Sequence, residues 1–100
     1  MVIYLILSGL VLFMASAQAA AEGYINIEIV NDGQYDQRIA VVDNICHLLV
    51  LERRIIADGL MPAQVCSRKM NRGNVTLRNL ESGAEREFPN VLDGDQLNVP

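Results

Sequence analysis

The sequence predicts an all-β domain, a small antiparallel β-sandwich of about six or seven short strands that follows an N-terminal signal segment. Three observations lead to this prediction. Several segments alternate apolar and polar residues with a period of two, which is typical of half-buried strands. Turn-forming residues followed by Gly recur along the chain, and in its later part they are spaced by about ten residues. The two cysteines, Cys46 and Cys66, are spaced so that a disulfide could join two strands or two sheets.

The first 21 residues, MVIYLILSGLVLFMASAQAAA, carry no charged side chain. The apolar run Val2–Met14 is followed by small residues, and both AQA at 17–19 and AAA at 19–21 fit the small-x-small rule for signal peptidase. We therefore expect residues 1–21 to be a cleaved signal peptide. The segment is also long enough to span a bilayer as a helix, so an uncleaved membrane anchor is the alternative. Either interpretation exports residues 22–100, and the expected location is secreted or periplasmic, or anchored in the membrane by residues 1–21.

Six further segments have the character of strands. Clean alternation of apolar and polar residues marks YINIEIV, NVTLRNL and DQLNVP, whereas RIAVVD and MPAQVC are short apolar runs. REFPNV contains Pro89, which cannot donate a hydrogen bond to a neighbouring strand and therefore suits a sheet edge. These segments occupy residues 24–30, 74–80, 95–100, 38–43, 61–66 and 86–91, respectively.

The stretch 44–57 fits two structures. As a hairpin it would consist of HLLVL at 47–51, a turn at Glu52 and Arg53, and RIIA at 54–57. As a helix it would begin at Asn44 as N-cap and end before Gly59, which would make the domain α+β with one helix near 44–57. Because strands precede and follow the stretch, we predict the hairpin.

Residues 22–100 form a single small domain on this interpretation, and a domain of that size commonly needs a covalent staple. A disulfide between Cys46 and Cys66 would supply one and would stabilise the fold by about 3 kcal/mol. Seven short strands with one disulfide indicate an immunoglobulin-like arrangement. The Cys…Trp…Cys pattern of antibody domains is missing, since the chain has no Trp.

The residues that could carry catalysis or bind a metal do not form a recognisable set. Cys46 and His47 are adjacent, so on a strand their side chains point to opposite faces, and a disulfide leaves no thiolate. A zinc site from Cys46, His47 and Cys66 lacks the usual short-spaced ligand pairs. The turns NDGQYD and LDGDQLN lack the order of acidic residues in a calcium loop. We expect no catalytic residue, no metal and no cofactor, and a protein that is not an enzyme.

Charge is distributed unevenly along the chain, whose net charge is −4. Residues 53–78 hold six of the eight bases and one acid, and acidic segments flank them. These charges are expected to pair across neighbouring strands or face solvent; the alternative is that the basic residues form a patch that binds an anionic partner. Nucleic acid is not an expected partner, because no aromatic residues are interleaved with the bases and the chain is acidic. The predicted partner-binding residues are Arg53, Arg54, Arg68, Lys69 and Arg72.

These features together predict an exported, non-catalytic binding or structural module. Its partner would be another exported protein, met at a strand edge or at the Arg-rich middle segment. One alternative is a small secreted enzyme inhibitor or immunity-type protein that presents RRIIADGLMP, residues 53–62, as its loop. Another is a membrane-tethered accessory subunit, in which residues 1–21 are retained and the membrane is a partner as well.

Overall fold

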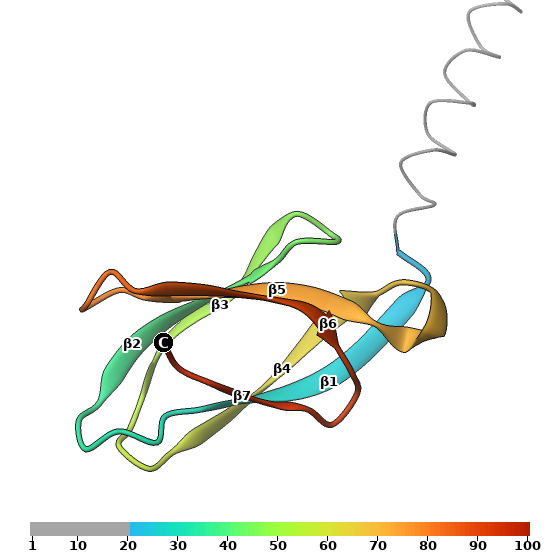
Figure 1. Cartoon of the computed structure of the whole chain (residues 1–100). Helices are drawn as coiled ribbons and strands as arrows, with labels where there is room; N and C mark the ends of the chain where they lie inside the picture. Colours follow the sequence, from blue (N-terminus) through green and yellow to red (C-terminus); the bar gives the residue numbers. More distant parts are fainter. Residues whose placement is uncertain (1–20) are drawn as a thin grey trace, which may run out of the picture.

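Two β-sheets packed face to face form the domain in the computed structural model, which describes residues 21–100 (Figure 1). Apart from Ala21, the predicted signal segment lies outside the described residues. None of the helices in the described range has the length and apolarity needed to cross a membrane. The elements are β1 (Gly23–Val30), β2 (Gln37–Asp43), β3 (Leu48–Ile55), β4 (Leu60–Ser67), the short 3-10 helix η1 (Lys69–Asn71), β5 (Gly73–Asn79), β6 (Glu85–Val91) and β7 (Gln96–Asn98).

One sheet has three strands in the order β4-β1-β7 and the other has four in the order β3-β2-β5-β6. Every pair is antiparallel except β1 with β7, which is parallel and joins Glu28–Val30 to Gln96–Asn98. The prediction of an all-β sandwich is therefore confirmed, with one parallel pair inside an otherwise antiparallel arrangement.

The core lies between the sheets and is built from the apolar residues that the period-two patterns predict. Ile25, Ile27 and Ile29 of β1 face inward, whereas Asn26 and Glu28 between them point outward. The buried apolar cluster consists of Ile25, Ile27, Ile29, Ile39, Val41, Ile55, Ala63, Val65, Val75, Leu77, Val91 and Leu97. Both sheets contribute to it, so each sheet buries its inner face against the other.

The stretch 44–57 is not helical, and the hairpin predicted within it is wrong in detail. A turn follows β2 at residues 44–47, and β3 then runs without interruption through Glu52 and Arg53. These two residues pair with Ala40 and Ile39 of β2, and Glu52 also forms an ion pair with Arg38. Pairing with β2 therefore holds extended the residues that would otherwise form a turn.

Gly73, the first residue of β5, allows the two sheets to approach each other closely. A Cβ atom placed there would lie 2.9 Å from the Cδ1 atom of Ile25 and 3.3 Å from the carbonyl oxygen of Cys66. We expect Gly73→Ala to lower the free energy of unfolding by about 2 kcal/mol, because buried atoms must move to admit the methyl group. Urea denaturation measures this change.

Gly23→Ala is the matched control, since the added Cβ would have only the Ser67 hydroxyl oxygen nearby, at 3.3 Å. We expect this variant to change the free energy of unfolding by less than about 1 kcal/mol. Equal losses for the two variants would show that the contacts at Gly73 do not limit the packing of the sheets.

Candidate functional site

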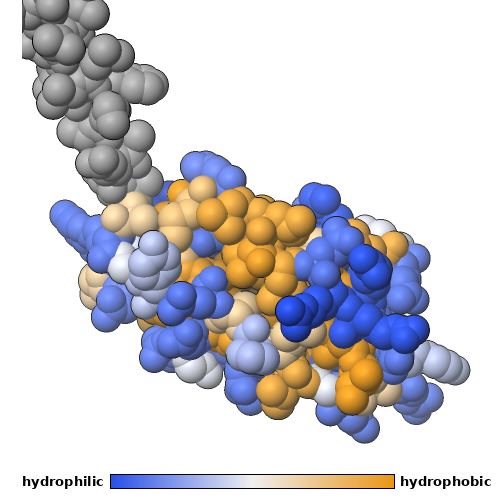
Figure 2. All heavy atoms as spheres, turned by 180° about the vertical axis from the view of Figure 1, so that it is seen from behind, coloured by the Kyte–Doolittle hydropathy of each residue, from blue (hydrophilic) through white to orange (hydrophobic). Residues whose placement is uncertain are grey.

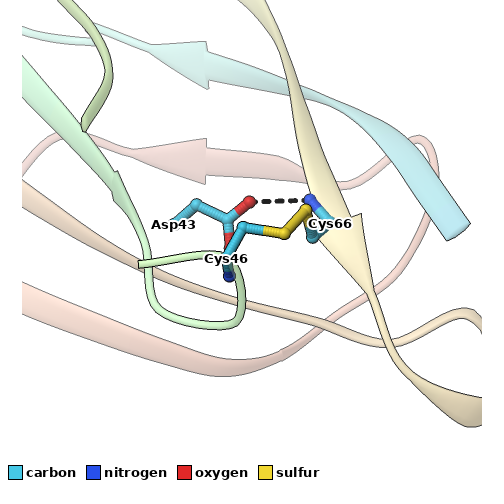
Figure 3. Close-up of side chains that lie close together, drawn as sticks. All are labelled: Asp43, Cys46 and Cys66. Atoms are coloured by element: carbon cyan, nitrogen blue, oxygen red, sulfur yellow. Dashed lines mark hydrogen bonds between the residues drawn. A yellow bond between two sulfur atoms is a disulfide. The ribbon is translucent and has the colours of Figure 1, made fainter. Parts of the chain in front are cut away.

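The disulfide joins the two sheets, and a buried carboxylate lies against it (Figure 3). Cys46 is in the turn after β2, at the end of the four-stranded sheet, and Cys66 is in β4 of the three-stranded sheet. Their Cα atoms are 6.1 Å apart, within the range of an unstrained bridge. The predicted pairing of Cys46 with Cys66 is thus present, and it connects the sheets where β2 ends.

Asp43 was not among the residues singled out by the sequence, yet its side chain organises this junction. It is the last residue of β2 and is 1% exposed. Its Oδ1 atom accepts hydrogen bonds from the backbone N–H groups of Ile45 and Cys46, at 2.9 and 3.0 Å. Its Oδ2 atom accepts one from Cys66 in the other sheet, at 2.7 Å (Figure 3). The carboxylate therefore shapes the turn and also ties it to β4.

Asp43, Cys46 and Cys66 are also the cluster with the best metal-ligand composition in the described part of the chain, because their donor atoms lie within 4.8 Å of one another. Both sulfur atoms are in the disulfide, and both carboxylate oxygens already accept backbone hydrogen bonds. With both sulfurs in the disulfide no thiolate is present, so a metal would have only the Asp43 carboxylate as a strong ligand. In this arrangement the cluster serves the fold.

The five basic residues predicted to bind a partner form two groups in the structure. Arg53 and Arg54 lie near the end of β3, where the loops after β1 and β3 are found. Arg68, Lys69 and Arg72 lie in and beside η1, next to the start of β1 and at the opposite end of the sandwich (Figure 1). The run of bases in the sequence is therefore two separate surfaces.

Ion pairs engage only some of the arginines in the described range. Arg38 pairs with Glu52 at 3.0 Å, Arg78 with Glu85 at 3.2 Å, and Arg54 with Asp36 at 3.9 Å. All six side chains are substantially exposed, so each pair adds little stability. Within residues 21–100 no acidic group pairs with Arg53, Arg68, Lys69 or Arg72.

The four edge strands differ in how well they are protected against pairing with another chain. β4 and β6 each contain an exposed proline, Pro62 and Pro89, and β7 has only three residues. Proline at an edge removes the hydrogen-bond donor that an added strand would need. β3 has eight residues and no proline, so among the edges of the described sheets it is the longest strand in which every residue keeps its backbone N–H donor.

The first half of β3 is apolar and partly exposed. Leu48 and Leu49 are 48% and 54% exposed, and Val50 and Leu51 are half-buried. Val50 is the extra residue of a β-bulge, because Val41 pairs with Leu51 and Val42 pairs with Leu49. Figure 2, which views the molecule from behind, shows an apolar area (orange) across the middle of the domain, with hydrophilic residues (blue) beside it.

No protein-family model matches the sequence, and a comparison with curated proteins gives no match either. A comparison with solved structures finds a likeness to the Bacillus anthracis TIE protein, with a TM-score of 0.49 and 11% sequence identity. The likeness covers 78% of this chain and 16% of that protein, so the chain spans about a sixth of the length of the protein it matches.

Proposed function

We propose that this protein is an exported, non-catalytic binding module that holds another exported protein by adding one of its strands to the edge of β3. The observation that carries the proposal is the contrast among the four edges: β3 alone among them is long, free of proline and lined by exposed leucines. β3 does have a bulge at Val50 and charged residues in its second half, but it lacks the proline or the short length that protects each of the other three edges, which makes it the candidate binding edge.

The second half of β3 adds a preference for charge. Arg53 lies on the same strand, beyond the apolar residues, and has no ion-pair partner among the described residues. A partner strand that runs along β3 would place its side chains opposite Leu48–Leu51 first and opposite Arg53 next. The best partner is therefore an extended segment that places apolar residues opposite Leu48–Leu51 and an acidic residue opposite Arg53.

Export is part of the proposal and has two supports. The uncharged segment 1–21 has the composition of a signal peptide. The Cys46–Cys66 disulfide fits an oxidising compartment outside the cytosol.

Photo-cross-linking in the cells that produce the protein tests the docking edge. A photoreactive amino acid replaces Leu49 on β3 or, as the matched control, Gln64, an exposed residue on the β4 edge. We expect an adduct with one exported protein from position 49 and none from position 64. Adducts from both positions in equal amounts, or from position 64 alone, would contradict docking at β3.

Once the cross-linked partner is identified, the contribution of the β3 edge to its binding can be measured. We expect Leu49→Lys to weaken its binding at least about tenfold, because a charge replaces an apolar contact at the added strand. Arg53→Glu is expected to weaken binding as well, whereas Arg86→Glu on β6 leaves it unchanged. Titration of the purified partner against each variant gives the dissociation constants, and an unchanged constant for Leu49→Lys contradicts the proposal.

A further inference from the structure

A turn with three bases and no acid lies where the chain enters the domain. It comprises Arg68, Lys69, Met70, Asn71 and Arg72, all of them exposed, and we call it the basic turn. The backbone N–H of Arg68 donates to the carbonyl oxygen of Arg72 at 2.8 Å, and the N–H of Asn71 donates to that of Arg68 at 3.1 Å. These bonds close the turn and present its side chains to solvent.

The conformation of the basic turn carries a cost that its own packing does not repay. Met70 has a φ angle of 65°, in the left-handed region that residues other than glycine and asparagine rarely adopt, and Asn71 follows it there at 55°. No residue of η1 is buried, and the Met70 side chain is 80% exposed. The basic turn thus exposes an apolar side chain between basic ones. Such a surface can contact a negatively charged group and a hydrocarbon chain together.

The position of the basic turn in the fold indicates what it binds. The backbone N–H of Glu22 donates to the carbonyl oxygen of Ser67 at 2.8 Å, so the residues just before the basic turn are bonded to the start of the described chain. The uncharged segment 1–21 ends one residue before Glu22. Tyr24, 70% exposed, pairs with Cys66 on the adjacent strand, two residues before Arg68. Tyrosine and basic residues beside an apolar segment are typical of a membrane interface.

The positive charge of the basic turn also favours a membrane surface as its binding partner. Arg68, Lys69 and Arg72 have no ion-pair partner in residues 21–100, and Glu22 is the acid next to them in the chain's entry to β1. We propose that, in the form of the chain that retains segment 1–21 as a membrane anchor, the basic turn binds the anionic headgroups of that membrane, with Met70 inserted among them. Basic side chains are attracted to an anionic lipid surface, so these three would strengthen the attachment made by an apolar segment beside them.

Lys69 makes the contact measurable, because it is the only lysine in the chain. The full chain is placed in lipid nanodiscs, and acetylation of Lys69 by a water-soluble reagent is followed by mass spectrometry. We expect Lys69 to react at least about threefold more slowly in discs of mixed phosphatidylcholine and phosphatidylglycerol than in discs of phosphatidylcholine alone. High salt should remove the difference, because it screens exposed charges.

Variants separate a contact made by the basic turn from a general effect of charge. Arg68→Glu with Arg72→Glu is expected to abolish the protection of Lys69 by anionic lipid. Arg53→Glu with Arg86→Glu removes the same number of bases from other exposed positions and should leave the protection intact. The intact mass of the disulfide form and far-UV circular dichroism check that each variant is folded.

Three results would overturn the proposal. The first is an equal rate of acetylation in the two kinds of disc, and the second is equal protection in both double variants. The third is protection that needs an added exported protein rather than lipid, which would make the basic turn a protein-binding surface. None of these results bears on docking at β3, which is tested by a different residue and a different partner.

Discussion

Asp43→Ala is expected to lower the free energy of unfolding by about 4 kcal/mol, the largest loss from a single substitution that we predict. The variant leaves the backbone N–H groups of Ile45, Cys46 and Cys66 without their acceptor. Two of the three hydrogen bonds are buried, and all are made to a carboxylate, where each bond is worth more than a neutral one. Small domains have about 5 to 15 kcal/mol in total, so much of the stability would be lost.

Two further variants identify the cause of the loss. Asp43→Asn retains one oxygen acceptor but replaces the other with an NH2 donor, which cannot accept a hydrogen bond from the backbone N–H that faces it, so an intermediate loss of about 2 kcal/mol is expected. Asp93→Ala removes an exposed carboxylate that accepts a single hydrogen bond, from the Asn26 N–H at 2.8 Å. It should cost less than about 1 kcal/mol. Urea denaturation gives all three values, and a loss for Asp43→Ala no larger than that for Asp93→Ala would contradict the role assigned to Asp43.

Local patterns in the sequence predicted most of the strands, because a strand that buries one face must alternate apolar and polar residues. β1, with its three inward isoleucines, is the clearest case. β3 could be predicted as a strand but not as a continuous one. Its turn was expected at Glu52 and Arg53, and the partners that keep those residues extended, Ala40 and Ile39, belong to a different strand. Pairing of that kind is a tertiary effect that a local pattern does not contain.

The role of Asp43 could be predicted only in part. An aspartate just before a turn commonly accepts hydrogen bonds from the N–H groups two and three residues later, and DNIC has that pattern. The bond to Cys66 comes from the opposite sheet, and nothing in the residues around Asp43 indicates it. The disulfide could be predicted from the spacing of the two cysteines and the expected export, whereas the role of the carboxylate beside it depends on how the two sheets pack.

The separation of the basic residues has a similar cause. In the sequence, one basic region holds Arg53, Arg54, Arg68, Lys69 and Arg72, because Asp58 is the only acidic residue among them. In the fold, β3 leads away from the end that holds the disulfide and β4 returns to it. The two groups of bases therefore lie at opposite ends of the domain. Arg53 belongs to the proposed docking edge, and Arg68, Lys69 and Arg72 belong to the basic turn.

Removal of the disulfide is expected to lower the free energy of unfolding by about 3 kcal/mol, the second large effect. The bond closes a loop with a sequence separation of 20 and joins the two sheets. Without it the unfolded chain gains freedom, while the folded domain keeps its core. The double variant Cys46→Ser with Cys66→Ser, compared with the native chain in urea, measures the loss. Addition of reductant should destabilise the native chain by a similar amount and leave the double variant unchanged.

The disulfide and Asp43 hold the same junction, so their effects should not add. Once the bridge is absent, the turn at 44–47 can move away from β4, and the bond between the Asp43 Oδ2 atom and the Cys66 N–H becomes easier to break. Asp43→Asn should therefore cost at least about 1 kcal/mol less in the double serine variant than in the native chain. Additive losses in this cycle would mean that the carboxylate stabilises only its own turn, and that the disulfide alone fixes the sheets to each other at this end.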